Sequence, residues 1–426
     1  MKAKIFTPYQ AFVVAVMAIL QFTVVLDFMV LSPLGAQLLK ELHISTSQFG
    51  LVVSVYAFSA GLSGILAAGF ADKFDRKKLL LFFYIGFVLG TLFCALAPTY
   101  KFLLAARMVT GFFGGVIGAV SFAIVADLFK LEIRGRVMGY IQMAFSFSQI
   151  LGIPVGLFLA NSWGWHSPFW VITALSVITG VIIFLYLKPI NDHLKIKNEN
   201  NPFKHLYKTL SNPNYVNTFV LTTLLTTGAF MLMPLGSTFM VNNLGVNIAL
   251  LPLIYIITGG FSIFIGPLLG KLSDKIGKYA LFTAASTLTM IIVVVYCNMS
   301  FIPLWTVVAL NVIMFIGIMG RIISSSALTT AVPELTDRGA FMSITSSLQQ
   351  VSGGIASILA GFIVFQTSSG LLKHYDILGY LVSAAIVGTI IMMHYVNRYV
   401  MQKNTAVLKN NVQENTFTEE TISKVS

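Results

Sequence analysis

The sequence contains few charged residues and only two cysteines. Charged side chains make up 10% of the 426 residues, whereas soluble proteins carry about 25%. This scarcity excludes most soluble enzymes and almost all nucleic-acid-binding proteins. Cys94 and Cys297 both lie inside apolar runs, so we interpret them as small buried hydrophobic residues rather than as a disulfide framework.

Motifs for catalysis and for cofactor binding are also missing. The six histidines lie in loops or at the ends of apolar runs, with no cysteine or acid at metal-ligand spacing. No Walker A sequence and no nucleophile elbow occur. We therefore expect no enzyme activity, no metal, no cofactor and no ATP-driven pump.

Long apolar runs dominate the chain instead, with 57% hydrophobic residues and a mean hydropathy of +0.85. A membrane-spanning helix needs about 20 mainly apolar residues. Twelve stretches meet this need: 9–38, 50–70, 78–97, 102–126, 138–160, 167–187, 216–240, 248–270, 279–298, 303–330, 340–366 and 375–400. They predict an all-α integral membrane protein with twelve transmembrane helices.

The basic residues are unevenly distributed between the loops. If the N-terminus is cytoplasmic, 22 of the 27 Lys and Arg residues fall on the cytoplasmic side and three on the opposite side. The positive-inside rule therefore places both termini in the cytoplasm. The net charge of +12 is then explained by topology and by attraction to anionic lipid, not by a nucleic-acid partner.

A hydrophilic interruption divides the predicted spans six and six. We expect an N-terminal six-helix bundle over 1–187, a cytoplasmic linker over 188–215, a C-terminal six-helix bundle over 216–400 and a disordered cytoplasmic tail over 401–426. The halves show a weak internal repeat at an offset near 202, where Asp72 aligns with Asp274. Two repeated six-span halves are typical of transporters whose substrate binds between the halves near the bilayer midplane.

The loop after the second span carries the motif GxxxD(R/K)xGR(R/K). Asp72, Lys73, Arg76 and Lys77 match it, while Ala68 and Asp75 replace its two glycines. A second copy follows the eighth span and keeps both glycines: Gly270, Asp274, Lys275, Gly277 and Lys278. On these residues the chain resembles the major facilitator superfamily, and within it the twelve-span drug:proton antiporters. The resemblance implies the major facilitator fold, and we expect a monomer in the bacterial cytoplasmic (inner) membrane.

The resemblance also implies that the acid of this motif acts as a conformational gate. We carry that role to Asp72, with Arg76 and Asp274 as its companions. Such a loop can form charge-assisted hydrogen bonds with the neighbouring half in one conformation and lose them in another. The alternative for Lys73, Lys77 and Lys78 is a solvated loop whose cations only set the topology.

Three ionisable residues remain inside the predicted spans: Asp27, Arg107 and Arg321. Each costs at least roughly 2.5–3.5 kcal/mol near the bilayer centre, so each needs a reason to be there. Asp27 is the only carboxylate placed deep enough to carry a proton across the membrane. Asp27 and Arg107 both fall in the outer half of the membrane, so they can pair if their helices face each other.

The fourth span resembles the family motif LxxxRxxQGxG at Leu103, Arg107 and Gly111, with Thr110 in place of Gln and Phe113 in place of Gly. The resemblance associates this Arg with proton coupling. We hypothesise that Asp27 takes a proton from outside and releases it inside as the substrate leaves. The alternatives are an Asp that caps the helix break near Pro33 or is held permanently by Arg107, and an Arg107 that is purely structural.

The fifth span resembles GxxxGPxxGG, with Ser148, Gly152, Pro154 and Gly156 in the region, the proline displaced by one position and Leu157 replacing the last glycine. We expect Gly111, Gly152 and Gly156 to allow close helix packing and Pro154 to bend its helix.

Polar residues on otherwise apolar spans are candidates for lining a substrate cavity: Gln21, Gln142, Gln149, Asn311, Arg321 and Gln349. Interhelical packing is the alternative for each amide. For Arg321, substrate contact, pairing and a structural role remain open.

The leading hypothesis is a proton-coupled secondary transporter, an antiporter that exports a small, partly hydrophobic compound by alternating access. Its partners would be that small molecule, protons and the lipid bilayer. One alternative is a transporter of a specific metabolite such as a sugar, an amino-acid derivative or a siderophore. Another is a transport-inactive membrane sensor or scaffold, which would need a folded regulatory module that neither the linker nor the tail displays.

Overall fold

The computed structural model of the chain describes residues 6–70, 74–129, 147–191, 207–334 and 337–425, together with positions 137, 140, 141 and 144. The described elements of the first half are α1 (Pro8–Val30), α2 (Gly35–Glu41), α3 (Thr46–Phe70), α4 (Arg76–Ala95), α5 (Tyr100–Leu128), η2 (Ser148–Gly152), α7 (Ile153–Trp163) and α8 (Ser167–Tyr186). Those of the second half are α10 (Pro213–Leu232), α11 (Gly236–Asn242), η4 (Ile248–Leu250), α12 (Leu251–Ile276), α13 (Lys278–Cys297), α14 (Leu304–Thr329), α15 (Arg338–Ile363), β1 (Phe365–Gln366), β2 (Leu372–Lys373) and α16 (Tyr375–Val425).

The prediction of an all-α membrane protein is confirmed. Within the described residues, ten helices are long and apolar enough to cross a bilayer. The remaining two predicted spans coincide with α15 and with the stretch through η2 and α7. The described strands are confined to one antiparallel hairpin, in which Phe365 pairs with Lys373.

Capping residues in the sequence define where several spans begin. Thr7 accepts a hydrogen bond from the backbone of Gln10, whose side chain bonds back to the Thr7 backbone, and Pro8 occupies the first helical position of α1. Asp75 caps α4 by accepting from the backbone N–H of Lys78, and Thr99 caps α5 by accepting from that of Phe102. These caps satisfy backbone N–H groups where the helices leave the polar loops.

The fifth span is irregular because of its proline. Ser148–Gly152 form a π-helical turn that leads directly into α7, where Pro154 is the second residue. Proline lacks a backbone N–H and cannot donate to the preceding turn, so the hydrogen-bond ladder widens there. The Ser148 hydroxyl, 2.9 Å from the Ala144 carbonyl and 3.2 Å from that of Phe22 on α1, lies between the irregular turn and its neighbour.

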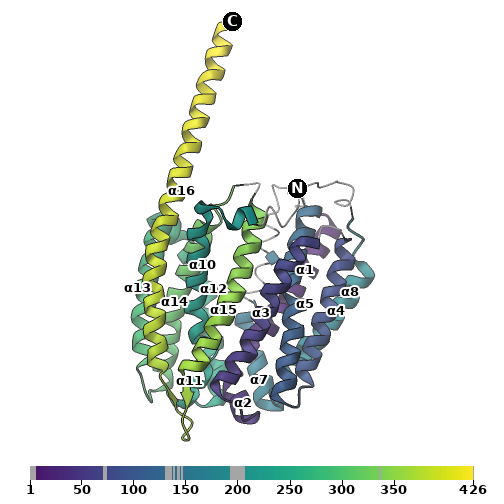
Figure 1. Cartoon of the computed structure of the whole chain (residues 1–426), viewed down its shortest axis with the longest axis vertical. Helices are drawn as coiled ribbons and strands as arrows, with labels where there is room; N and C mark the ends of the chain where they lie inside the picture. The colour runs from purple at the N-terminus through teal and green to yellow at the C-terminus, as the bar shows by residue number, and fades with distance from the viewer. Residues whose placement is uncertain are drawn as a thin grey trace.

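The helices form two bundles side by side, one from the purple to blue elements α1–α8 and one from the teal to yellow elements α10–α16 (Figure 1). The N-terminus lies at the upper end of the bundles in this view, and the short helices α2 and α11 lie at the lower end. The last described helix of the first bundle is α8, and the first of the second bundle is α10. The central part of the predicted linker, 192–206, lies outside the described residues.

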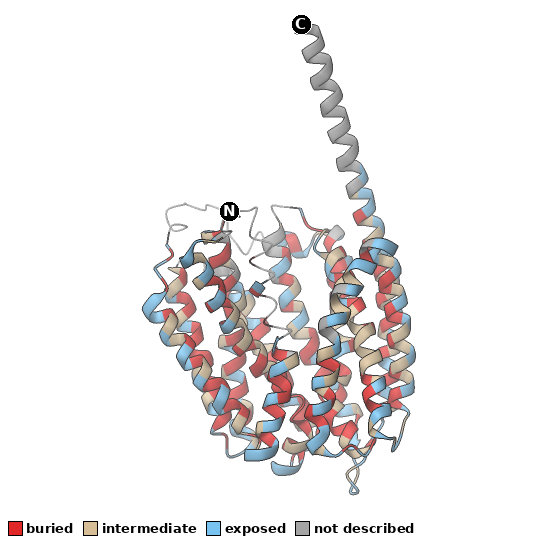
Figure 2. Cartoon of the chain, turned by 180° about the vertical axis from the view of Figure 1, so that it is seen from behind, coloured by how far each residue is buried: buried red, intermediate tan, exposed pale blue. Residues whose placement is uncertain are grey.

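The buried apolar residues divide into three clusters. Figure 2 colours the buried residues red, and they occur throughout both bundles. One cluster belongs to the first half alone and runs from Val13 to Ile190, and a second belongs to the other half alone and runs from Tyr215 to Val400. The third combines both halves and includes Leu34 next to α2 and Leu235 next to α11. The two bundles therefore share a core at the end of the molecule that is remote from the termini.

Hydrogen bonds between the halves also lie toward that end, among the residues that the structure describes. The Ser32 hydroxyl donates to the Met233 carbonyl at 2.6 Å, and the Ser237 hydroxyl donates to the Ser32 carbonyl at 3.2 Å. The Ser54 hydroxyl lies 2.7 Å from the Gly354 carbonyl. The bundles are thus joined at the end opposite the termini.

Helices α3 and α15 form the seam between the halves and pack almost backbone to backbone. A Cβ atom added to Gly50 would lie 2.6 Å from the Ser357 carbonyl oxygen, and one added to Gly361 would lie 2.7 Å from that of Thr46. Small residues at a membrane helix interface permit this close approach.

The last helix continues into the C-terminal tail, and the disorder expected of that tail stays a prediction. Helix α16 continues without interruption from Tyr375 to Val425 and extends beyond the bundles (Figure 1). The stretch after Gly388 contains neither glycine nor proline, so no residue in it stops the helix.

Candidate functional site

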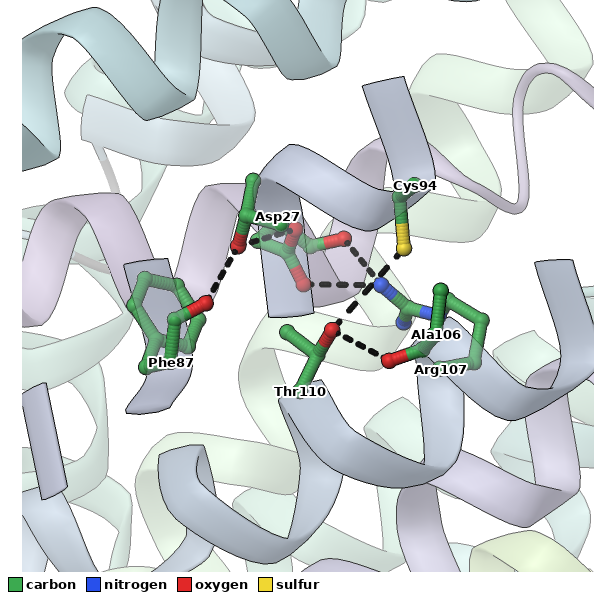
Figure 3. A network of polar contacts seen from close by, with 7 residues as sticks. Asp27, Phe87, Cys94, Ala106, Arg107 and Thr110 are labelled. Carbon is green, nitrogen blue, oxygen red and sulfur yellow. Dashed lines mark hydrogen bonds and ion pairs between the residues drawn. The ribbon is translucent and has the colours of Figure 1, made fainter. Parts of the chain in front are cut away.

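Asp27 on α1 and Arg107 on α5 form an ion pair inside the first half. The distance between Arg107 Nη1 and Asp27 Oδ2 is 2.7 Å, and both side chains are 0% exposed. The same nitrogen lies 3.3 Å from the Asp27 backbone carbonyl oxygen (Figure 3). The pairing that the equal depth of these residues permits is therefore present.

The second carboxylate oxygen of Asp27 contacts a threonine that the sequence analysis missed. Thr91 Oγ1, on α4, lies 3.2 Å from Asp27 Oδ1 and 3.1 Å from the Phe87 carbonyl oxygen. A hydroxyl carries one hydrogen, so it donates to only one of these acceptors at a time. When Asp27 is ionised, Thr91 can donate to it, and when Asp27 is protonated, Thr91 can accept from it and donate to Phe87.

The guanidinium of Arg107 also contacts an aromatic ring. Its Cζ lies 4.4 Å from the centre of the Tyr56 ring, which comes from α3, in a cation–π contact. Arg107 Nε and Nη2 have no hydrogen-bond partner among the described protein atoms. The guanidinium thus retains donor capacity that the ion pair does not use.

Glycines bring the helices that carry this network close together. A Cβ on Gly90 of α4 would lie 2.6 Å from Thr110 Oγ1 of α5, and a Cβ on Gly111 of α5 would overlap the backbone oxygen of Tyr56 on α3. Gly90 directly precedes Thr91. The small residues therefore place Thr91 and Tyr56 within reach of Asp27 and Arg107.

This arrangement combines one group that can change charge with one that cannot. Guanidinium stays protonated in proteins, whereas a carboxylate can bind a proton. Protonation of Asp27 would remove the charge that balances Arg107 in a site with no solvent exposure. The network therefore links proton binding at Asp27 to a change in how α1, α4 and α5 hold each other.

The predicted gate residues are only partly described. Asp72 lies outside the described residues, and so does the side chain of Asp274. Arg76 Nε lies 3.1 Å from Asp127 Oδ2, so this contact joins α4 to α5 within the first half. Asp75 accepts from the backbone N–H of Lys78 at 3.0 Å. The contacts described for Arg76 and Asp75 thus organise their own half, and the gate at Asp72 stays a prediction.

The glycines of the fifth span lie against the first helix. A Cβ on Gly152 would lie 2.5 Å from Leu26 Cδ1, and one on Gly156 would lie 2.7 Å from Val30 Cγ2. Because Leu26 directly precedes Asp27, the π-helical turn and α7 pack on the segment that carries the acid.

The polar residues predicted to line a cavity are only partly described, and that role stays a prediction. The side chains of Gln142 and Gln149 lie outside the described residues. Gln349 is exposed, and Gln21 is partly buried with its Oε1 unpartnered. Asn311 Nδ2 donates to the Val307 carbonyl at 2.9 Å, which supports the packing alternative for this amide.

Arg321 lies on α14 in the second half, apart from the ion pair of the first. It is 8% exposed, and its Nη2 lies 3.4 Å from Thr389 Oγ1 on α16. No carboxylate of the described residues lies within ion-pair distance of it. The pairing alternative for Arg321 therefore finds no acid in the part of the chain that the structure describes.

Comparison with known proteins gives a consistent family. The family model of the Major Facilitator Superfamily matches residues 17–357. The uncharacterized MFS-type transporter YceJ of Bacillus subtilis is 29% identical over 188 residues, which cover 44% of this chain and 48% of the relative. The chain thus spans about half the length of that relative.

Two relatives have names that describe a transported compound. Multidrug resistance protein 2 of Bacillus subtilis is 27% identical over 267 residues, covering 60% of this chain and 66% of the relative. A probable sugar efflux transporter of Helicobacter pylori is 25% identical over 148 residues, covering 35% and 38%.

The fold is shared with transporters of known structure. A bacterial homologue of the human lysosomal transporter Spinster, in an inward-facing and occupied conformation, superposes with a TM-score of 0.68 at 14% identity, covering 95% of this chain and 98% of the other. The family match, the fold and the intramembrane network agree. The chain belongs to the Major Facilitator Superfamily, and its helices are those of a multi-pass membrane protein.

Proposed function

We propose that this transporter is a proton-coupled antiporter that exports a small, partly hydrophobic compound from the cytoplasm. The observation that carries the proposal is the fully buried pair of Asp27 and Arg107. Asp27 is the single acid deep in the spans, so it is the group available to bind a proton there. The resemblance to relatives named multidrug resistance proteins supports export of a foreign or toxic compound.

Alternating access supplies the mechanism. With both termini in the cytoplasm, the core that the bundles share lies at the outer end, so this conformation is closed to the outside and faces inward. In the outward-facing conformation, Asp27 binds a proton from outside and its contact with Arg107 loosens. In the inward-facing conformation, Asp27 releases the proton to the cytoplasm, the pair closes again and a new substrate binds.

Location and assembly follow from the same proposal. We place the protein in the bacterial cytoplasmic membrane with both termini inside, and we expect a monomer to be sufficient, because both bundles that enclose the substrate come from one chain. The side of the termini can be tested by labelling a cysteine introduced into the α16 extension in intact cells. Labelling by an impermeant reagent from outside would contradict the proposed topology.

A growth screen followed by transport measurements tests the function. A strain lacking its own exporters that produces this protein should tolerate a set of toxic compounds, and one such compound, labelled, then serves as the substrate in membrane vesicles. An imposed pH gradient should drive its accumulation with the native protein. Asp27→Asn should exchange the compound down its gradient and fail to concentrate it.

Two further variants serve as controls for the Asp27→Asn measurement. Asp27→Asn combined with Arg107→Gln removes both charges, so it should lose coupling without leaving an unpaired arginine in the core. Asp376→Asn changes an acid in the first turn of α16, outside the buried network, and should keep coupling. Concentration of the compound by Asp27→Asn against its gradient would eliminate the proposed role of this acid.

A second candidate is efflux of a sugar, which the similarity to the Helicobacter pylori relative favours. Labelled mono- and disaccharides in the same vesicles distinguish it from drug export. Competition of a sugar with the compound found in the growth screen would show that both use one site.

A further inference from the structure

Among the residues that the structure describes, the buried Arg321 of the second half has no counter-charge. Arg321 is 8% exposed, its Nε has no hydrogen-bond partner, and its Nη2 has only the Thr389 hydroxyl at 3.4 Å among the described atoms. Thr389 Oγ1 itself lies 2.7 Å from the Ile386 carbonyl, so its hydrogen points there and its oxygen accepts from Arg321. Thr389 therefore orients the guanidinium but does not balance its charge.

Buried hydroxyls without a hydrogen-bond partner occur on the same helix as this arginine and on the neighbouring α13. Ser324 follows Arg321 by three residues, so it lies on the same face of α14, and it is 0% exposed with an unpartnered hydroxyl. Ser286 on α13 is equally buried and unpartnered. It adjoins the close crossing of α13 and α14, where a Cβ on Gly320 would lie 2.7 Å from Ala285 Cβ. The surroundings thus offer hydrogen-bond donors beside a fixed positive charge.

The charges within the spans also indicate that Arg321 lacks a partner of negative charge. Asp27 and Arg107 neutralise each other, so Arg321 leaves the membrane interior with one uncompensated positive charge. An isolated buried charge that cannot lose its proton is costly, and the usual solution is a partner of opposite sign. Arginine has no acceptor, and the two serine hydroxyls can turn to donate, so the missing partner must be an acceptor with negative charge.

We infer that Arg321 and Ser324, with Ser286 beside them, form a buried binding site for one anionic group. The group comes from a small inorganic anion such as chloride, or it is the carboxylate of the transported compound. Arg321 supplies the charge and its free Nε–H, Ser324 supplies a second donor, and Thr389 fixes the orientation of the guanidinium. This site is independent of proton binding at Asp27.

Thermal unfolding of the purified full-length protein tests the site. Chloride, benzoate and gluconate are compared as sodium salts at one ionic strength, with gluconate as the large anion that does not fit. The native protein should unfold roughly 2–4 °C higher in chloride or in benzoate than in gluconate. Arg321→Gln should show no anion response, and in gluconate it should be at least as stable as the native protein because the unbalanced charge is gone.

Matched variants keep the test decisive. Ser324→Ala removes one donor and should weaken the apparent affinity for the anion about fivefold or more, which corresponds to about 1 kcal/mol, and it provides the measurement should Arg321→Gln not fold. Lys373→Gln, an exposed cation on β2, should respond as the native protein does.

Each outcome decides between the sources or rejects the site. A response to chloride alone assigns an inorganic anion, and a response to benzoate alone assigns a carboxylate and makes anionic compounds the cargo to test first. Equal unfolding temperatures of the native protein in all three salts overturn the inference. Equal anion responses of the native protein, Arg321→Gln and Ser324→Ala overturn it as well.

Discussion

The two halves of the molecule have the same order of helices but differ in the residues that they bury at matching positions. The first half has charged and polar residues where the second half has neutral ones. In the first half, Arg107 is the eighth residue of α5 and pairs with Asp27. In the second half, Asn311 is the eighth residue of α14 and bonds to a backbone carbonyl. Thr91 is the sixteenth residue of α4, and Val293 is the sixteenth residue of α13. The polar network around Asp27 therefore has apolar or neutral residues at two matching positions of the second half.

This difference shows what a repeated fold preserves. The repeat preserves helix lengths and helix packing, because each half must form a bundle of the same kind. It does not preserve charge, because the first half buries Asp27 with Arg107 whereas the second half buries Arg321. The second half is thereby free to keep Arg321 at a position of its own.

The largest expected loss of stability distinguishes the two members of the ion pair, Asp27 and Arg107. Asp27→Asn leaves Arg107 buried, unpaired and unable to lose its charge, so unfolding of the purified protein should become easier by about 3–5 kcal/mol. Arg107→Gln should be less harmful, because the remaining Asp27 can bind a proton. Asn311→Leu, at the matching position of the second half, should change stability by about 1 kcal/mol or less. A larger loss in Arg107→Gln than in Asp27→Asn would show that charge balance does not govern this site.

The next effect concerns Thr91. Thr91→Val introduces the residue type that the second half has at this position, and it removes a hydrogen bond to an ionised group, so we expect a loss of about 1.5–3 kcal/mol. Thr91→Ser keeps the hydroxyl and should lose less. In the Asp27→Asn background the difference between Val and Ser should shrink, and chemical denaturation of the four proteins measures this coupling. An unchanged difference would mean that Thr91 acts through packing alone.

Glycine packing provides a third contrast between the halves. Gly111→Ala would place a methyl group against the backbone of Tyr56, which cannot move aside, and should cost about 1–3 kcal/mol. Gly317→Ala meets the hydroxyl of Thr289 first, and a side chain can rotate away. The unfolding temperature of Gly111→Ala should therefore be lower than that of Gly317→Ala. Gly118→Ala, whose nearest contact is the Gln21 amide oxygen at 3.8 Å, is the control expected to be nearly neutral.

The smallest expected effect is that of the ring over Arg107. Tyr56→Leu removes the cation–π contact and should lower stability by about 0.5–2 kcal/mol, whereas Tyr56→Phe keeps the ring and should retain most of it. Equal losses of stability in Tyr56→Phe and Tyr56→Leu would assign the contribution of this residue to its hydroxyl or to packing. Unfolding in the same detergent as the other variants makes the values comparable.

Hydropathy predicted the architecture well because the membrane imposes the length and composition of each span. The predicted run 340–366 corresponds to α15 and 279–298 corresponds to α13. The depth of Asp27 and Arg107 also followed from counting residues, because a helix rises by a constant amount per residue.

The rotation of each helix about its axis was not predictable in the same way. The predicted site included neither Tyr56 nor Thr91, because nothing in one sequence fixes which faces of α3 and α4 meet α5. The glycines at 90 and 111 carried part of that signal, since they mark where backbones approach. The π-helical turn before Pro154 was expected only as a bend, because the way a helix accommodates proline depends on its neighbours.

The core shared by the bundles has a consequence for biosynthesis. Leu34 and Leu235 belong to one apolar cluster but are separated by some two hundred residues, so the ribosome completes the entire first bundle before their contact can exist. The clusters confined to a single half need no such delay. During synthesis, each bundle can therefore consolidate the end near its terminus first, and the opposite end is completed only when the second half arrives to cover it.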